Sequence, residues 1–379
     1  MQKNDYLFII KSFLGWRLLL FLVLFFAFKY VPLQKDFLGG GLFNYLSNPH
    51  LWALANFDGE HYLSIAQNGY LPLTYAFFPV YPYLIKLFAE TFGHTLINYL
   101  FSGLLFSHLF LACALVGFYK LALIDYKKNL VRAALLILLF FPTSFYFAGV
   151  YTESLFLLLA VWAFYFMRKG NFLASGFFIA VASATKVIGI LMIPALLIEF
   201  YLKSKKSFNW RDVLGLLISP LGLIYYMLYL HNAGQSPIEF FQAQTLVGET
   251  RQTSFVMLPQ VIYRYIFKIL PNLNYSYFPG MFSGWMEFIV SISFLTISVL
   301  SFLRIRLGYA VFLLLGFLAP TITGSFSSMP RYVLILFPAY LVMAGFIGKS
   351  RLWKFVYLGI SFILLSISLA LFSRGYWIS

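Results

Sequence analysis

The chain has 379 residues, of which 61% are hydrophobic and 21% aromatic, and its mean hydropathy is +0.85. One water-soluble core cannot hide that much apolar surface, so the composition excludes an ordinary soluble protein and predicts a polytopic membrane protein. The net charge of +15 does not indicate nucleic-acid binding, because Lys and Arg fall in short clusters between apolar runs, as in the cytoplasmic loops of membrane proteins.

Eleven apolar segments are predicted to cross the membrane as helices. Lipid supplies no hydrogen bonds to an exposed backbone, which leaves helices and closed barrels, and the continuous apolarity of these runs argues against a β-barrel. In chain order the segments are about 12–31, 96–119, 130–147, 154–167, 172–185, 187–202, 212–230, 284–303, 308–323, 331–348 and 353–373. The single cysteine, Cys113, lies in the second segment and is interpreted as a packing residue.

The basic clusters set the predicted topology. They lie near residues 127–132, 168–169, 203–211, 304–306 and 349–354, and we expect all of them on the cytoplasmic side. The apolar stretch between the second and third clusters must then cross twice, dividing near Lys186 into two short helices of the kind tolerated beside a protein cavity. The N-terminus is predicted to be cytoplasmic and the C-terminus external, with residues 1–379 forming one membrane domain.

Two long connections, residues 32–95 and 231–283, are predicted to lie on the outer side. Both are rich in aromatic residues. Their amphipathic pieces, Gly59–Asn68 and Phe255–Leu270, are expected to lie flat at the interface with Tyr, Phe and basic side chains at headgroup level. The sequence leaves open whether the second connection binds an acceptor or covers a site.

Four polar motifs fall on this predicted outer side. They are N-F-D-G-E-H-Y at 56–62, A-F-F-P-V-Y-P at 76–82, Y-T-E-S-L-F at 151–156 and S-M-P-R-Y at 328–332, and Lys186 joins them at the turn between two short helices. Ionisable groups are scarce in this chain, so their gathering on one face indicates a site.

Each group also has a structural interpretation. Asp58 is a favoured residue type for the N-cap of a helix starting at Gly59, and Glu60 would sit in the first turn of that helix. His61 is a candidate for a hydrogen bond to the backbone, and Glu153 for solvating a turn between two spans. Arg331 and Lys186 are candidates for flanking residues that reach toward the headgroups.

Taken together, the groups favour chemistry on a lipid-linked phosphate. A carboxylate near the membrane surface can act as a general base toward a hydroxyl, and two cations can hold an anionic leaving group. The sequence has no H-x-x-H, H-E-x-x-H or D-x-D spacing and no Gly-rich phosphate loop, so neither a metal, a nucleotide nor another cofactor is predicted.

At these motifs the chain resembles the PIG-V family of polytopic mannosyltransferases and their bacterial relatives, which have the C-type glycosyltransferase (GT-C) architecture. The matching stretches are F-D-G-E-H-Y-L-S-I-A-Q-N-G-Y (57–70), A-F-F-P-V-Y-P (76–82), F-P-T-S-F-Y-F-A-G-V-Y-T-E-S-L-F (141–156) and M-P-R-Y-V-L-I-L-F-P (329–338). Two positions depart from the family pattern: Phe57 stands where relatives commonly have Trp, and Lys186 where they tend to have Arg, which would lose bidentate contact with phosphate.

The resemblance implies roles for individual residues. Asp58 would be the catalytic base, and His61 with Tyr62 would shape the sugar or acceptor site. Glu153 would be a further polar contact with the substrate, and the donor phosphate would be bound by a cationic group. That group consists of Arg331 and Lys186, and Tyr332 would be a further contact with the substrate.

The predicted function is therefore inverting transfer of a sugar, most simply mannose, from a polyprenyl-phosphate donor to an acceptor hydroxyl on the non-cytoplasmic face. The acceptor would be a glycolipid, a glycan or a protein side chain, and the membrane a prokaryotic plasma membrane, or the endoplasmic reticulum in a eukaryote. A lipid or glycolipid transporter or flippase is the alternative, using the same acid and cations as a gate, although such proteins also carry ionisable groups at mid-membrane depth.

Overall fold

The computed structural model describes residues 1–35, 37, 41–204, 209–243, 256–348 and 350–378. These residues are predominantly helical, and no strand occurs among them. Lys205, Lys206 and Lys349 of the predicted basic clusters, and Phe255 at the start of the second amphipathic piece, lie outside the described residues.

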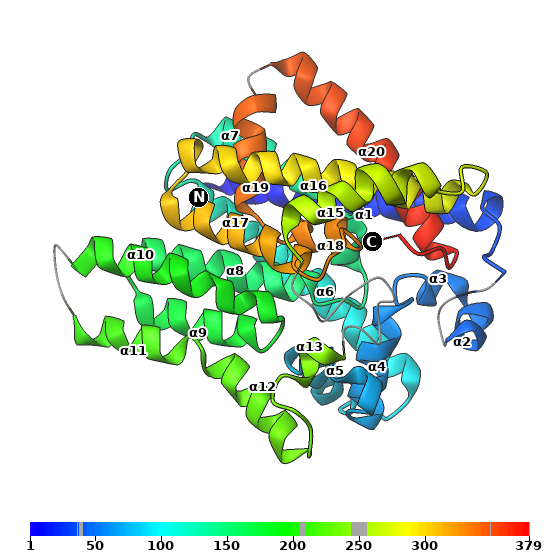
Figure 1. Cartoon of the computed structure of the whole chain (residues 1–379), viewed down its shortest axis with the longest axis horizontal. Helices are drawn as coiled ribbons and strands as arrows, with labels where there is room; N and C mark the ends of the chain where they lie inside the picture. The colour runs from blue at the N-terminus through cyan, green and yellow to red at the C-terminus, as the bar shows by residue number, and fades with distance from the viewer. Residues whose placement is uncertain (36, 38–40, 205–208, 244–255, 349, 379) are drawn as a thin grey trace.

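Most of the helices run along the long axis of the molecule (Figure 1). The longer elements, and the short ones continuous with them, are α1 (Lys3–Tyr30), α6 (Leu96–Ala122), α7 (Lys128–Leu139), η2 (Ser144–Ala148), α8 (Glu153–Arg168), α9 (Phe172–Ser183), η3 (Val187–Met192), α10 (Ile193–Ser204), α11 (Trp210–Ile218), α12 (Leu221–Asn232), α16 (Phe278–Arg304), α17 (Leu307–Thr321), α18 (Met329–Leu334), α19 (Pro338–Ile347) and α20 (Arg351–Ser373).

The two long connections contain the remaining short helices. They are α2 (Leu42–Ser47), α3 (Pro49–Trp52), α4 (Asp58–Asn68), η1 (Pro72–Thr74) and α5 (Val80–Ala89) in the first, and α13 (Glu239–Gln242), α15 (Leu258–Arg264), the π-helical turn η4 (Tyr265–Ile269) and η5 (Leu270–Asn272) in the second. In Figure 1, α2 to α5 lie at the lower right, away from the N-terminus.

Each of the eleven predicted segments falls on a helix or on two consecutive helical pieces. Six of the described stretches are long and apolar enough to span a bilayer: Lys3–Tyr30, Leu96–Ala122, Val187–Ser204, Trp210–Asn232, Phe278–Arg304 and Arg351–Ser373. The described part of the chain is therefore all-helical, and the protein is a polytopic membrane protein, as its composition predicted.

Small residues let some helices approach very closely. A Cβ atom added at Gly176 of α9 would lie 1.9 Å from the backbone oxygen of Gly215 of α11, and one added at Gly222 of α12 would lie 1.7 Å from the Ala180 oxygen. Such contacts are typical of helix pairs in lipid, where association depends on packing more than on the hydrophobic effect. The helices α11 and α12 are held against α9 in this way.

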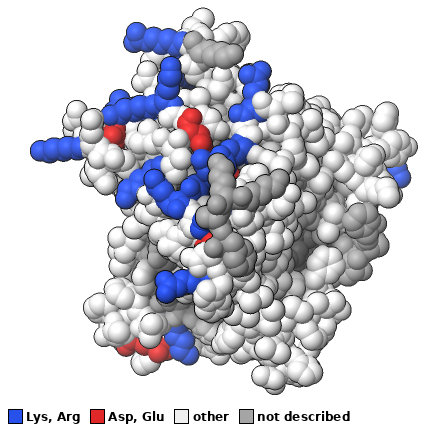
Figure 2. Space-filling view, turned by 90° about the vertical axis from the view of Figure 1, so that its left-hand side faces the viewer, with Lys and Arg blue, Asp and Glu red and all other residues white. Residues whose placement is uncertain are grey.

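One end of the bundle carries most of the basic residues, and Figure 2 shows Lys and Arg gathered there with few acids. We call it the basic end. Four acids at this end pair with cations of other segments: Asp5 with Lys128 (2.5 Å), Asp125 with Arg168, Asp212 with Lys203 (2.6 Å) and Glu199 with Arg306 (2.8 Å). These four pairs tie α1 to α7, the residues after α6 to α8, and α10 to both α11 and the start of α17.

Candidate active site

Asp58 is the first residue of α4 and lies where the chain is held tightly. The preceding Phe57 has a φ of 57°, a left-handed conformation that is strained for a large side chain. Tyr151 donates a hydrogen bond to the Asn56 oxygen at 2.6 Å, and the Asn56 amide donates to the Phe372 oxygen at 3.2 Å. Packing and these hydrogen bonds hold the backbone in this strained conformation.

The Asp58 side chain does not cap its helix. It makes no hydrogen bond to the helix backbone, and its Oδ2 instead lies 2.5 Å from Nη2 of Arg331, with only 8% of the residue exposed. The N-cap interpretation of Asp58 is therefore wrong, and so is the interpretation of Arg331 as a flanking residue, because Arg331 is 6% exposed.

Arg331 also contacts a second carboxylate. Its Nε donates to Oε1 of the fully buried Glu153 at 3.0 Å, and Lys186 Nζ donates to the same oxygen at 2.7 Å. Asp58, Glu153, Lys186 and Arg331, which we call the charge quartet, come from α4, the start of α8, the turn after α9 and α18. The structure thus brings together four of the residues that the sequence analysis selected, from positions up to 273 residues apart.

The charges of the quartet balance, since two carboxylates face two cations. Burial raises the pKa of the Asp58 carboxyl, but the charge and hydrogen bond of Arg331, with smaller contributions from His61 and Lys186, lower it by more, so the pKa lies below its ordinary value of 3.8. Asp58 is thus ionised at neutral pH.

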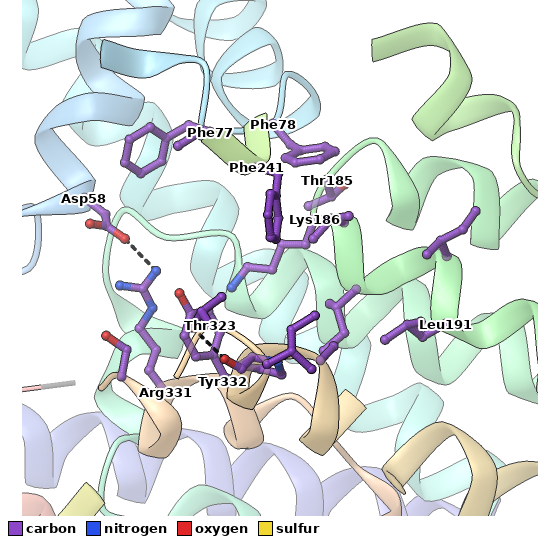
Figure 3. A pocket seen from close by; sticks show the side chains of 18 of the residues that line it. Asp58, Phe77, Phe78, Thr185, Lys186, Leu191, Phe241, Thr323, Arg331 and Tyr332 are labelled. Carbon is purple, nitrogen blue, oxygen red and sulfur yellow. Dashed lines mark hydrogen bonds and ion pairs between the residues drawn. The ribbon is translucent and has the colours of Figure 1, made fainter. Parts of the chain in front are cut away.

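A cavity of about 330 Å³ opens beside the quartet. Figure 3 shows Asp58 and Arg331 facing each other on one side of it, Lys186 reaching toward it from the other, and Phe77, Phe78 and Phe241 above. Its polar lining comprises Asp58, Tyr62, Thr185, Lys186, Thr323, Ser328, Arg331 and Tyr332. Its apolar side, from η3 and the end of α17, includes Ile188, Leu191, Pro320 and Ile322.

Two residues that were predicted to contact substrate do not line this cavity. Glu153 lies behind Lys186 and Arg331, and its Oε2 is buried without a hydrogen-bond partner. His61 stacks on Phe77, with the ring centroids 4.8 Å apart, and so reaches the cavity only through that ring. Glu60 is not simply solvated, because its Oε2 accepts a 2.7 Å hydrogen bond from the Gly41 backbone.

The loop before Arg331 contacts a residue that the sequence analysis missed. Glu287 of α16, 8% exposed, accepts a hydrogen bond from Tyr265 at 2.8 Å and one from the Ser328 backbone at 3.3 Å. Ser328 has a φ of 64° and immediately precedes α18. A lone glutamate within an apolar span was the signal that could have identified it.

Trp377 is a second residue that the sequence analysis missed. It lines the cavity and meets the Phe57 ring edge-on at 5.1 Å. The Ile378 oxygen beside it accepts a 2.6 Å hydrogen bond from Tyr146, which holds this part of the chain against the site. Nothing in the sequence near Trp377 indicated that this residue would pack against the first long connection.

The quartet suits an anion better than a metal ion. In the described part of the chain, no group of three or more His, Cys, Asp or Glu side chains is placed to hold a metal. Arg331 and Lys186 instead offer several N–H donors at the cavity wall, and such donors bind phosphate oxygens.

Comparisons with known proteins identify an enzyme family. The chain matches the family described as "Mannosyltransferase (PIG-V)" over residues 17–273. It is 30% identical over 155 residues to the GPI alpha-1,6-mannosyltransferase 2 of Rattus norvegicus. That match covers 39% of this chain and 32% of the rat protein, so the chain spans about a third of this relative's length. No solved structure matches the chain closely enough to support a comparison.

Proposed function

Because the chain belongs to the PIG-V mannosyltransferase family, we propose that it moves a mannose from a polyprenyl-phosphate donor to an acceptor hydroxyl on the non-cytoplasmic face of a membrane. The observation that carries this proposal is the contact of Arg331 with the Asp58 carboxylate at the wall of a cavity that combines two cations with an apolar side. A base, an anion site and a surface for an isoprenoid tail are the three requirements of such a reaction.

The reaction is a single displacement. The acceptor oxygen attacks the anomeric carbon while Asp58 takes its proton, and the bond from that carbon to the phosphate oxygen breaks on the opposite face of the sugar. Configuration at the anomeric carbon is therefore inverted. The leaving group is already a phosphate anion of low basicity, so no acid has to protonate it, in contrast to glycoside hydrolysis.

The charges of the quartet suit this displacement. During the reaction Asp58 becomes neutral as the leaving phosphate gains one negative charge, so the total charge of the site is unchanged. Arg331 contacts Asp58 before the reaction and is placed to contact the phosphate after it, and Lys186 supplies a second cation. Preorganised donors of this kind stabilise a developing anion without reorganisation at the moment of reaction.

Glu153 holds the two cations rather than the substrate. Its Oε1 binds both Lys186 and Arg331, which fixes their head groups relative to each other. Tyr62 and Tyr332 line the cavity and are proposed to contact the donor or its sugar, and His61 to support the wall through Phe77.

The donor tail is proposed to lie against the apolar side formed by η3 and the end of α17, where it would continue into the lipid. The basic end then faces the cytoplasm, in keeping with the positive-inside rule, and the quartet faces outward. A GT-C arrangement with eleven spans in a prokaryotic plasma membrane, or in the endoplasmic reticulum of a eukaryote, is part of the same proposal. The acceptor is a glycolipid or glycan.

The proposal is tested by incubating purified protein with radiolabelled polyprenyl-phosphate-mannose and a panel of glycolipid and glycan acceptors. We expect transfer by the wild type and by Asp212→Asn, which changes an acid at the basic end, but not by Asp58→Asn. Absence of transfer to every acceptor by folded wild type would reject the assignment and favour a transporter, which flipping of a fluorescent polyprenyl phosphate in liposomes would then detect.

A further inference from the structure

Tyr151, the first residue of the Y-T-E-S-L-F motif, has no part in the reaction described above. Its side chain is 1% exposed and does not line the cavity. It nevertheless reaches both members of the Asp58–Arg331 pair, because its hydroxyl binds the backbone just before Asp58 and its ring lies against the guanidinium of Arg331. A buried residue with these two contacts is placed to set the position of one group relative to the other.

The hydroxyl of Tyr151 holds the turn that presents Asp58. It donates at 2.6 Å to the oxygen of Asn56, which belongs to the peptide leading into Phe57. Because Phe57 has a φ of 57°, a conformation that large side chains rarely adopt, the orientation of this peptide has to be held by contacts from outside the turn. A rotation of the peptide would move Asp58 relative to Arg331.

This hydroxyl keeps the proton that the hydrogen bond requires. Burial raises the pKa of the Tyr151 phenol well above its ordinary value. The neighbouring Tyr146 and the two carboxylates of the quartet act in the same direction, against the charge of Arg331. The hydroxyl of Tyr151 is therefore a donor throughout the neutral pH range.

The ring of Tyr151 supports the guanidinium of Arg331. The guanidinium carbon lies over this ring at 5.3 Å from its centroid and over the Tyr146 ring at 5.4 Å, and the two rings are 4.7 Å apart at an angle of 73°. A cation within about 6 Å of an aromatic face is attracted to it, more strongly where water is excluded. This contact holds Arg331 and leaves its N–H groups free to bind Asp58 and a phosphate.

Close packing fixes the Tyr151 ring itself. A Cβ atom added at Gly149 would lie 2.9 Å from Cδ2 of the ring, and one added at Gly59, the residue after Asp58, would lie 3.7 Å from its Cε2. The ring is therefore held between the backbone that precedes it and the first turn of α4. It has little room to move away from either contact.

We propose that Tyr151 is a positioning residue that aligns the base and the anion-binding cation together, with its hydroxyl setting the turn before Asp58 and its ring setting the guanidinium of Arg331. This inference rests on the proposed function, in which these two groups act on the acceptor proton and the leaving phosphate. A residue that only stabilised the fold would change the amount of folded protein and leave Asp58 in the folded molecules unaltered.

The titration of Asp58 tests the alignment without any sugar transfer. The chain contains five aspartates, so nuclear magnetic resonance of protein with isotope-labelled aspartate carboxyl groups gives few signals, and Asp58→Asn identifies that of Asp58. In wild type this signal should stay constant between about pH 4 and 8, because the pKa of Asp58 lies below its ordinary value of 3.8, chiefly through Arg331.

Two substitutions of Tyr151 separate its hydroxyl from its ring. Tyr151→Phe removes the hydroxyl and keeps the ring, whereas Tyr151→Leu removes both. As Asp58 and Arg331 become less closely aligned, burial gains weight and the pKa of Asp58 rises, although His61 and Lys186 still act on it. We expect the signal to begin moving at the acid end of the range in Tyr151→Phe and to titrate within the range in Tyr151→Leu.

Transfer kinetics should follow the same order. We expect kcat to fall about tenfold in Tyr151→Phe and about a hundredfold in Tyr151→Leu, the usual cost of misplacing reacting groups. The acid limb of kcat/KM should move to higher pH in both variants, since the raised pKa leaves less of the base ionised. The donor KM should rise only in Tyr151→Leu, which removes the ring that supports Arg331.

Tyr45→Phe is the matched control. Tyr45 is also 1% exposed, and its hydroxyl donates at 2.7 Å to a backbone oxygen, that of Ser373, but the residue does not line the cavity. Its substitution should leave the Asp58 signal unchanged and kcat within about twofold of wild type. Size-exclusion chromatography checks that each variant is folded, and Tyr151→Phe, which removes one oxygen atom, decides the test if Tyr151→Leu is not.

An Asp58 signal that is the same in wild type and Tyr151→Phe would overturn the proposal, and so would a loss of kcat with an unmoved acid limb. Either result would leave mannose transfer by wild type intact. If folded wild type transfers no mannose while the Asp58 signal responds as expected, the proposed function fails and the alignment of Asp58 by Tyr151 is supported. The two failures are therefore distinguishable.

Discussion

Both ends of the helical bundle hold buried acids in contact with bases, but the contacts differ in pattern. At the basic end, each acid has its own principal cation from another segment, and three of these cations are about a third exposed: Lys128, Lys203 and Arg306. In the charge quartet, Arg331 bonds two acids and Glu153 bonds two cations, and every side chain is at most 13% exposed.

This difference separates two uses of the same residue types. An ion pair whose cation reaches water adds little stability, and it can define which helix ends lie together without taking part in chemistry. A buried set of shared contacts is costly to assemble and sensitive to the loss of any member, but one of its contacts can be exchanged for a ligand. Substitutions of equal chemistry at the two ends should therefore have very unequal effects.

The largest effect is expected from Asp58→Asn. The amide cannot accept the acceptor proton, so kcat should fall by about 10²–10⁴-fold, the usual contribution of a general base. Steady-state transfer kinetics measure this, with Asp125→Asn at the basic end as the matched control. A mutant that keeps more than half of the wild-type kcat would remove Asp58 from the mechanism.

Arg331→Gln should change both the rate and its dependence on pH. Loss of the cation leaves the developing phosphate charge less stabilised, for which about a 10²-fold or greater loss of kcat is expected. Burial also then dominates the pKa of Asp58, so the pKa rises. In wild type the base is lost only below about pH 3.8; in the mutant the acid limb of kcat/KM should move to higher pH, and an unmoved limb would contradict this.

A smaller effect is expected from Glu287→Gln. The amide keeps the shape of the side chain and an acceptor for the Ser328 N–H, but it weakens the hold on the loop before Arg331. We expect the donor KM to rise by several fold and the change to be non-additive with Arg331→Lys, as for residues acting through one contact. Strict additivity in the double-mutant cycle would mean that Glu287 does not act through Arg331.

The smallest effect is expected from Glu199→Gln at the basic end. It removes the negative charge and one of the two oxygens that accept from Arg306 at 3.0 and 2.8 Å, yet that cation is 37% exposed and can be solvated. Kinetic constants should stay within twofold of wild type, and stability should fall by no more than about 1 kcal/mol. A tenfold loss of activity here would show that the ion pairs at the basic end affect the charge quartet, which would contradict the difference drawn between the two ends.

Much of this arrangement was predictable, for identifiable reasons. Apolar length and basic clusters located the helices, and the scarcity of charge in this chain made Asp58, Glu153, Lys186 and Arg331 conspicuous. Which side of the quartet faces the cavity was not predictable, because the orientation of Glu153 toward the two cations depends on packing between α8, α9 and α18. Trp377 was missed because its contact with Phe57 joins opposite ends of the chain.

The separation of the quartet along the chain also matters during synthesis. Glu153 and Lys186 can pair as soon as α8, α9 and the turn after them have been inserted, whereas Asp58 waits for Arg331. At about 5–20 residues per second, that delay is on the order of tens of seconds. The nascent protein must therefore keep the Asp58 carboxylate without its cation until Arg331 has been synthesised, and a chain interrupted before that residue carries no assembled quartet.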